Sequence, residues 1–423
     1  MALAEPVGPL SGQPAGSGTR ILIVVADSLG ERMAGPAIRA WQMARVLGHE
    51  HEVVLATTSR CDRVGVGFTA CWVDEAKLRS LVGWCAVVVV RGFVTAAHPW
   101  LLTEDRILVA DVYDPMHLEA LEQHRNSGAD VRRRAWQGAV LALNDQLLRA
   151  DLVLCASERQ RDFWLGAMAA LGRVDPAAYD DDATLRRLLA VVPFGLPEVA
   201  PARTRAALRG VVPGIEPGDE VIIWGGGIYD WFDPLTLVRA VDRLRRRRPS
   251  VRLFFLGMAH PDAAADGSTM AGTTRALAAE LGLLGQHVFF NTGWVVYDDR
   301  ANYLLDADIG VSTHRDSLET AFAFRTRVLD YLWAGLPVVT TAGDTLADLV
   351  TARDLGVAVP PGDVRALEEA LFTLLDDEHL AVGCRQRVAG VAAELTWPVV
   401  LAPVLAFCRQ PRRAADRLAT SQP

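Results

Sequence analysis

The sequence contains almost no lysine. Of its 423 residues, 43 are lysine or arginine, and Lys77 is the single lysine. A phosphate-binding loop of the Walker type needs Gly-Lys-Ser or Gly-Lys-Thr, a string that is absent here. Schiff-base catalysis would require a desolvated lysine, yet Lys77 lies in the polar stretch 74–77. The sequence therefore excludes a P-loop nucleotide hydrolase and argues against lysine-based covalent catalysis.

Cysteine pairs, long apolar runs and an excess of basic residues are also missing. The six cysteines include no Cys-x-x-Cys pair, so we expect neither a disulfide framework nor a metal site. The longest apolar run, residues 84–90, is far shorter than the roughly 20 residues that span a bilayer. The net charge of −8 argues against a dedicated nucleic-acid-binding protein.

The first 19 residues are rich in Gly, Pro, Ala and Ser and contain neither a basic region nor a continuous apolar core. This composition is typical of a disordered leader rather than a secretion signal. We therefore expect a cytoplasmic protein.

Short apolar runs alternate with amphipathic stretches along the rest of the chain. Continuous apolar strands of this kind are typical of a parallel sheet that is buried on both faces. The alternation stops and restarts once, and a hydrophobic fraction of 51% can fill more than one core. We therefore predict two successive α/β domains. The expected strands are residues 21–26, 53–57, 86–90, 107–111 and 152–155, followed by 221–224, 253–257, 288–291, 309–312, 338–341 and 357–359.

Prolines and a glycine mark the expected join between the domains at residues 192–197. The predicted domains are residues 20–197 and 198–396. Residues 397–423 would form a helix that crosses back to the first domain, followed by a tail. Because ligands of open α/β sheets bind beyond the carboxyl ends of the strands, we look for chemistry in the strand-to-helix loops.

Two loops of the first domain contain candidate residues. After the first strand, Gly35 as N-cap and Pro36 at the first helical position predict either an anion site or only a helix cap. After the fourth strand, His117 would orient or protonate a hydroxyl, and Asp111 would bind a sugar or fix a histidine tautomer. The alternative for His117 is a purely structural histidine.

Two segments of the second domain point to an anionic ligand. Gly226 and Gly227 follow the first strand, where glycines let the backbone approach a pyrophosphate closely. A helix is predicted from about Arg325 to Gly335, and its first turn carries Arg325 and Arg327 against the helix dipole. These cations indicate a compensating bound anion, whereas an ion pair between Arg327 and Asp330 is the alternative.

The segment from Arg327 to Val338 reads Arg-x-x-Asp-Tyr-x-x-Ala-Gly-Leu-Pro-Val. It resembles the nucleotide-sugar segment of the family-four (group 1) retaining glycosyltransferases. This family has the GT-B fold, in which two Rossmann-like domains face each other and a carboxyl-terminal helix crosses back. Supporting matches are residues 35–36, 192–195 and 291–294.

The resemblance implies roles for particular residues. Asp330 would hold the ribose hydroxyls, Trp294 would meet the base, and His314 would lie in a loop over the sugar. The family's first acid falls at Phe322, so Glu319 would reach the transferred sugar instead. The family's cations for the diphosphate are also missing, so Arg325, Arg327 and the amides of the glycine turn would replace them.

The resemblance implies sugar transfer from a nucleoside diphosphate sugar to a hydroxyl, with retention and without a cofactor or divalent metal. The acceptor stays open among glycans, lipid-linked compounds and small molecules. Two alternatives remain: a nucleotide-sugar epimerase, and a protein that binds a nucleotide sugar or a partner transferase without turnover. The arginines at 243 and 245–248 predict either a solvated helix end or contact with an anionic membrane surface.

Overall fold

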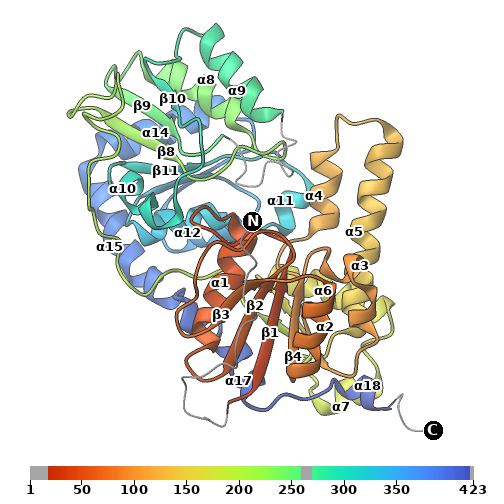
Figure 1. The fold of residues 1–423 in the computed structure, drawn as a ribbon. Helices are drawn as coiled ribbons and strands as arrows, with labels where there is room; N and C mark the ends of the chain where they lie inside the picture. The colour runs from red at the N-terminus through yellow and green to blue at the C-terminus, as the bar shows by residue number, and fades with distance from the viewer. Residues whose placement is uncertain (1–17, 259–268, 420–423) are drawn as a thin grey trace, which may run out of the picture.

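The computed structural model describes residues 18–258 and 269–419. The predicted leader therefore lies outside the described residues, apart from Gly18 and Thr19. Two parallel sheets organise the described chain, one in each half of the sequence. Figure 1 shows the two sheet domains one above the other, with α4 of the first domain meeting α11 of the second.

The first sheet has seven strands in the order β3-β2-β1-β4-β5-β6-β7, and all its pairings are parallel. Its central strands are apolar and buried, which agrees with helical cover on both faces. The strands are β1 (Arg20–Val25), β2 (Glu52–Thr57), β3 (Thr69–Trp72), β4 (Val87–Arg91), β5 (Ile107–Asp111), β6 (Leu152–Cys155) and β7 (Leu189–Val191). The helices are α1 (Gly35–Leu47), α2 (Glu75–Trp84), α3 (Val94–Ala97), α4 (Met116–Gln123), α5 (Ala129–Arg149), α6 (Glu158–Ala170) and α7 (Pro176–Asp181).

The second sheet has six parallel strands in the order β10-β9-β8-β11-β12-β13. Its strands are β8 (Glu220–Trp224), β9 (Val251–Phe255), β10 (Val288–Phe290), β11 (Ile309–Ser312), β12 (Val338–Thr341) and β13 (Gly356–Val359). Its helices are α8 (Pro234–Leu244), α9 (Met270–Glu280), α10 (Arg300–Leu304), α11 (Leu318–Phe322), α12 (Thr326–Trp333), α13 (Thr345–Ala352), α14 (Val364–Asp376) and α15 (Glu378–Glu394).

Every predicted strand is present, and the structure adds two that the sequence pattern does not indicate. These are β3, whose four residues are all at least partly exposed, and β7, which has only three residues. The prediction of two facing α/β domains with parallel sheets is confirmed.

Two segments far apart in sequence cross between the domains side by side. The N–H of Leu196 donates to the carbonyl of Leu395 (2.7 Å), and the N–H of Trp397 donates to the carbonyl of Leu196 (2.9 Å). Trp397 is fully buried, and its ring lies 4.8 Å from that of Phe194. A Cβ at Gly195 would lie 2.7 Å from the Trp397 ring, so the close crossing requires glycine there.

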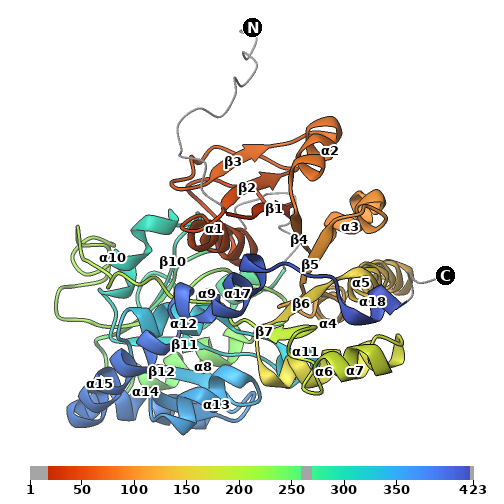
Figure 2. The same ribbon diagram turned by 90° about the horizontal axis from the view of Figure 1, so that it is seen from below.

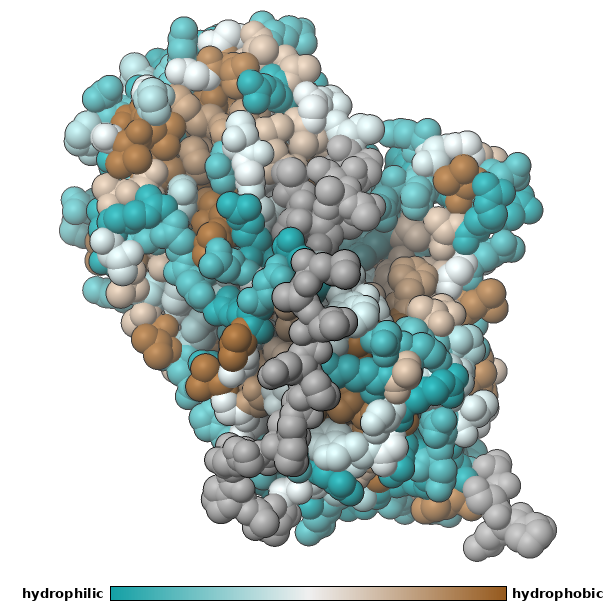
Figure 3. All heavy atoms as spheres, viewed as in Figure 1, coloured by the Kyte–Doolittle hydropathy of each residue, from teal (hydrophilic) through white to brown (hydrophobic). Residues whose placement is uncertain are grey.

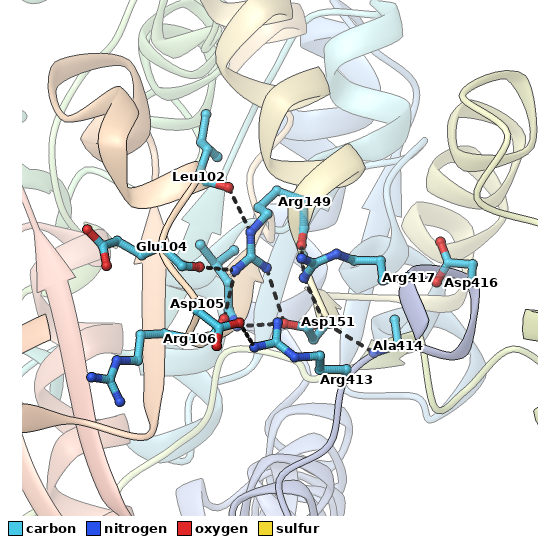
Figure 4. A network of polar contacts seen from close by, with 12 residues as sticks. Leu102, Glu104, Asp105, Arg106, Arg149, Asp151, Arg413, Ala414, Asp416 and Arg417 are labelled. Atoms are coloured by element: carbon cyan, nitrogen blue, oxygen red, sulfur yellow. Dashed lines mark hydrogen bonds and ion pairs between the residues drawn. The ribbon is translucent and has the colours of Figure 1, made fainter. Parts of the chain in front are cut away.

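After this crossing, the chain returns to the first domain through α16 (Trp397–Val400), α17 (Ala402–Arg409) and α18 (Ala415–Ala419). Figure 2 shows the segment running across the first domain, with α18 near α7. A buried polar network anchors its end, in which Asp151 accepts from Arg417 (2.8 Å) and from Arg149 (3.2 Å) (Figure 4).

Apolar residues form small groups among polar ones on the face in Figure 3. Among the described residues, no helix is long and apolar enough to cross a bilayer. The arginines at the carboxyl-terminal end of α8 and just after it are paired with carboxylates, which favours their interpretation as a helix end. The pairs are Arg243–Glu368, Arg245–Asp242, Arg246–Asp242, Arg247–Glu369 and Arg248–Glu220.

Candidate active site

A cavity of about 830 Å³ lies between the two domains. The first domain lines it with the start of α1 and with loops that follow β1, β2, β4 and β5. The second domain lines it with the turn after β8, the loop after β10 and the start of α12. The cavity therefore lies where parallel strands of both sheets end, as expected for a ligand site of open α/β domains.

The glycine turn after β8 is held against α12. Gly226 has a φ of +83°, a conformation that favours glycine. The N–H of Gly225 donates to the Tyr331 hydroxyl (2.8 Å), which itself donates to the carbonyl of Val311 (2.7 Å). Gly226 and Gly227, both predicted as donor-binding residues, line the cavity.

Helix α12 begins and ends where the sequence predicts. Arg325 is its N-cap, and Gly335 follows the C-cap with a φ of +71°. The N–H of Leu336 donates to the carbonyl of Tyr331 (2.9 Å), which closes the last turn as in a Schellman motif. This end fixes α12 so that its first turn lies at the cavity.

Arg327 lines the cavity and has no carboxylate partner among the described residues. Its Nη2 donates to the carbonyl of Gly227 (2.9 Å), and its guanidinium lies 3.9 Å from the centroid of the Phe232 ring. Its Nη1 is buried and has no hydrogen-bond partner in the described chain. Burial lowers the pKa of Arg327 to about 10, so the side chain remains charged at neutral pH.

Asp330 also lines the cavity, but it does not pair with Arg327. Its carboxylate accepts from Nε of Arg300 (3.1 Å), whose guanidinium lies over the rings of Tyr297 (3.8 Å) and Trp333 (4.4 Å). The predicted alternative, an ion pair within the helix, is therefore absent. Arg300 is a residue of the site that the sequence analysis missed, because no local pattern marks it.

Arg325 lines the cavity, whereas Glu319 lies behind it. Nη2 of Arg325 donates to Oε2 of Glu319 (2.6 Å), and Asp344 lies 3.8 Å from Nε of Arg325. Glu319 is 1% exposed and is not among the described residues that line the cavity. Glu319 was expected to reach the transferred sugar. In the structure it instead holds Arg325.

His314 also differs from its prediction. It follows β11, is fully buried, and does not line the cavity. Its Nε2 lies 3.6 Å from Asp344. Burial, together with the charges of Arg325 and Arg327, holds the pKa of His314 well below its ordinary value. His314 is thus a buried, neutral residue inside the second domain.

Trp294 and Gly35 line the cavity from opposite domains. The indole Nε1 of Trp294 donates to the carbonyl of Met33 (3.3 Å), which links the loop after β10 to the loop before α1. Gly35 is the first residue of α1 and Ala34 is its N-cap, so the predicted cap is displaced by one residue. The amino-terminal end of α1 nevertheless faces the cavity.

Asp111 is bound by a buried arginine rather than exposed to substrate. Nε and Nη2 of Arg39 donate to its two carboxylate oxygens (2.6 and 2.9 Å). The same guanidinium donates to the carbonyls of Val192 and Pro193 (both 3.0 Å). Asp111 does not line the cavity. The pair instead fastens α1 and β5 to the segment that leads to the second domain, which corrects the predicted catalytic role.

His117 packs on aromatic rings of α6. Its ring stacks on Phe163, with 5.6 Å between centroids and an angle of 19°, and it also contacts Trp164. Burial lowers the pKa of His117 to about 4, so it is neutral at physiological pH. It does not line the cavity, and the structural alternative therefore describes it better than a role in catalysis.

The first domain contributes charged residues that the sequence analysis missed as site residues. Arg91, at the end of β4, pairs with Asp114 and lies 3.4 Å from Asp27. Glu119, in the first turn of α4, also lines the cavity. Burial raises the pKa of Glu119 to about 8, and the nearby carboxylates of Asp114 and Glu319 add to this effect. The signal that could have found them is their place at the carboxyl-terminal end of a strand, for Arg91, and in the first turn of the helix that follows a strand, for Glu119.

Phe322, at the position of the family's first acid, makes an interdomain contact. Its ring lies 4.5 Å from that of Phe163. Nε2 of Gln160 donates both to the carbonyl of Phe322 and to that of Tyr113 (2.7 Å each). The residue that replaces the expected acid therefore joins α11 to the first domain.

Two facing domains with parallel sheets and a cavity between them form the arrangement of the GT-B fold. Anabaena HepE, solved in complex with UDP-glucose, has a TM-score of 0.64 and 14% identity, covering 95% of this chain and 100% of that chain. Sucrose-phosphate synthase from Thermosynechococcus elongatus has a TM-score of 0.61 and 14% identity, with 95% and 100% covered. These likenesses confirm the predicted fold.

The second domain also matches a family by sequence. Residues 219–377 match the family model described as "Glycosyl transferases group 1". Sucrose-phosphate synthase 1 of Arabidopsis thaliana is 36% identical over 64 residues, which is 15% of this chain and 6% of that relative. The second domain is therefore similar to that of group 1 glycosyl transferases, and the resemblance inferred from residues 327–338 is confirmed.

Proposed function

We propose that the protein transfers a sugar from a nucleoside diphosphate sugar to a hydroxyl of an acceptor, with retention and without a divalent metal. The observation that carries this proposal is Arg327, which is buried in the cavity wall without a carboxylate partner among the described residues. A buried cation of this kind is costly unless a ligand supplies the missing negative charge. A diphosphate supplies it.

The residues that line the cavity support one arrangement of the donor. Nη1 of Arg327 and the amides of the glycine turn would bind the diphosphate, with Arg325 beside them. The carboxylate of Asp330 would bind the vicinal hydroxyls of the ribose, and Trp294 would lie against the base. The amino-terminal end of α1 would face the donor from the other domain.

The reaction requires stabilisation of the leaving diphosphate. The bond between the anomeric carbon and the diphosphate oxygen breaks, and the acceptor oxygen forms the new bond on the same face of the sugar. The proton of the acceptor hydroxyl passes to the departing phosphate oxygen. Charge that develops on the diphosphate is stabilised by Arg327, Arg325 and backbone N–H groups, which are already in place at the cavity.

A donor panel tests this proposal. A thermal-shift screen of nucleoside diphosphates and their sugars should identify a ligand that raises the melting temperature. The same donor, incubated with candidate acceptors, should give a glycoside whose anomeric configuration, read by proton NMR, matches the donor. The rate should persist in EDTA. A product of inverted configuration would overturn retention, and loss of activity in EDTA would overturn metal independence.

The two alternative functions give different results in this assay. An epimerase would release free nucleotide and an epimer of the sugar, and it would not transfer the sugar to an added acceptor. A protein without turnover would bind the donor but would neither transfer its sugar nor hydrolyse it slowly in the absence of an acceptor.

A further inference from the structure

Asp344 lies between a histidine and an arginine of the second domain. It is the N-cap of α13, and its Oδ1 accepts from the N–H of Ala347 (2.7 Å). Its Oδ2 lies 3.6 Å from Nε2 of His314 and 3.8 Å from Nε of Arg325. One oxygen therefore has a fixed role in the helix, and the other faces two different partners.

The atoms that face each other here are buried, and the described chain satisfies none of them. Asp344, His314 and Arg325 are 1%, 0% and 5% exposed. Oδ2 of Asp344, both ring nitrogens of His314 and Nε of Arg325 have no hydrogen-bond partner among the described residues. Because an unpaired buried polar atom is destabilising, a small movement of the Asp344 carboxyl towards either neighbour would be favourable.

The protonation state of Asp344 decides between the two neighbours. An ionised carboxylate only accepts hydrogen bonds, so it would pair with the N–H of Nε of Arg325. A protonated carboxyl group can donate. His314 is neutral, and in the tautomer with its proton on Nδ1 its Nε2 is the matching acceptor.

Arg325 connects this cluster to the cavity, which its side chain lines. Two carboxylates lie around its guanidinium, because Nη2 donates to Glu319 (2.6 Å) while Asp344 faces Nε. A diphosphate beside Arg325 would add negative charge close to both, which favours protonation of one of them. Glu319 lies at hydrogen-bonding distance and Asp344 does not, so Asp344 is the group expected to take up the proton.

We propose that Asp344 is a positioning residue that takes up a proton when a nucleoside diphosphate sugar binds, a role that rests on the proposed function. In the free protein, its carboxylate attracts Nε of Arg325. When the diphosphate binds Arg325, Asp344 takes a proton from solvent and donates a hydrogen bond to Nε2 of His314. Donor affinity is thereby coupled to pH.

The groups around Asp344 place its titration in a measurable range. Burial raises the pKa of Asp344 to about 6, and Glu319 adds to this effect, whereas Arg325 and the N–H groups of α13 oppose it. His314 is neutral, and Glu119, which faces Arg325 from the first domain, has a pKa of about 8. Asp344 is therefore mostly ionised at pH 7 in the free protein, and a bound diphosphate would raise its pKa.

Titration calorimetry with a nucleoside diphosphate sugar measures the coupling. The probe is the sugar that gives the largest thermal shift in the donor panel, because its diphosphate lacks the terminal phosphate that titrates near neutral pH. If binding raises the pKa of Asp344 to about 7, affinity should fall about fivefold from pH 6 to pH 8. At pH 6.5, titrations in two buffers of different ionisation enthalpy should show uptake of about half a proton.

Asp344→Asn and a matched control locate the effect. Asparagine caps a helix about as well as aspartate, and its amide can donate to His314, but it takes up no proton. The variant should lose the uptake at pH 6.5 and most of the fall in affinity. Asp363→Asn, at the exposed N-cap of α14, should behave as wild type. Equal pH dependence in all three proteins would overturn the proposal.

His314→Phe tests the second partner. This variant removes Nε2, so the protonated form of Asp344 loses its acceptor, and proton uptake on donor binding should be smaller than in wild type. Uptake equal to that of wild type would overturn the exchange of Asp344 between two partners.

The titrations also separate this role of Asp344 from the proposed function. If no nucleoside diphosphate sugar binds at any pH, the proposed function fails and the coupling fails with it. If one binds with a pH dependence that Asp344→Asn leaves unchanged, only the coupling is wrong.

Discussion

Arg39 and Arg327 show how different surroundings give two buried arginines different uses. Arg39 is fully buried, and its guanidinium reaches both oxygens of Asp111 and two carbonyls. Arg327 reaches one carbonyl and two aromatic rings and retains an uncompensated charge at the cavity. The first is satisfied by the protein itself, whereas Nη1 of the second has no hydrogen-bond partner among the described residues.

The histidine of α4 should affect how stability depends on pH. The folded pKa of His117 is about 4, below the ordinary 6.5, so the unfolded chain takes up the proton first as the pH falls. Unfolding free energy should therefore rise between pH 4 and pH 6.5, by up to about 2 kcal/mol from this group after allowance for its partial exposure. Urea denaturation across this range should show a smaller rise in His117→Phe. An identical rise in the variant would contradict the prediction.

Asp330 should contribute to nucleotide affinity. Asp330→Ala removes the carboxylate expected to bind the ribose and leaves Arg300 without its partner. Affinity for the nucleoside diphosphate should fall by about 1 to 2 kcal/mol in titration calorimetry, the scale of a hydrogen bond to a charged group. Asp330→Asn, which keeps one acceptor oxygen, should lose less. Unchanged affinity in the alanine variant would leave Asp330 only as the partner of Arg300.

At the scale of single residues, sequence analysis predicts the position of a side chain when the residues of a site lie close together in the chain. Arg325, Arg327 and Asp330 lie close together in the chain, and the structure places all three at the cavity. The pairing of Asp111 with Arg39 spans 72 residues, and no local pattern shows it. The same limit explains why Asp111 and His117 are expected at the substrate although tertiary contacts occupy both.

Helix α12 and the glycine turn behave as one structural element. The Tyr331 hydroxyl joins the N–H of Gly225 to the carbonyl of Val311. A Cβ at Gly310 would lie 2.2 Å from the Tyr331 ring, so β11 also requires glycine where this ring passes. The position of the backbone amides that would bind phosphate therefore depends on a side chain of the helix.

Tyr331→Phe tests this coupling. The variant leaves the N–H of Gly225 and the carbonyl of Val311 without this partner, which should cost about 1 to 3 kcal/mol of unfolding free energy in urea denaturation. Nucleoside diphosphate affinity should fall as well. Tyr179→Phe, at an exposed tyrosine, is the control and should change neither quantity. Loss of stability with full affinity would show that the turn does not depend on Tyr331.

The elements themselves are predictable because their signals are local. Apolar runs mark the central strands, and Gly335 marks the end of α12. Strand β3 lacks this signal because all four of its residues are at least partly exposed, and β7 is too short to show a pattern. The N-cap of α1 is Ala34, one residue before the predicted Gly35, because Pro36 is the second helical residue rather than the first.

The relation between the two domains depends on the crossing at Trp397. This side chain is fully buried against Phe194 and Gly195, and the chain around it bonds to the backbone of Leu196. Figure 2 shows that the chain continues from there along the first domain. One buried aromatic side chain thus joins the linker, the carboxyl-terminal helices and both domains.

Trp397→Ala should therefore destabilise the whole molecule. Removal of a fully buried tryptophan typically costs about 3 to 5 kcal/mol. Trp72→Ala is the matched control, because Trp72 is 51% exposed, and its cost should be far smaller. Equal shifts of the two denaturation midpoints would contradict a special role for the crossing.

The central claim is that Arg327 holds the diphosphate of a nucleotide sugar, and calorimetric titration of a nucleoside diphosphate tests it most directly. Wild type and Arg246→Ala, a control at an arginine whose side chain is 73% exposed, should bind with equal affinity. Arg327→Ala should bind about 1.5 to 3 kcal/mol more weakly, the scale of a charge-assisted hydrogen bond. Equal affinity in all three proteins would contradict the claim.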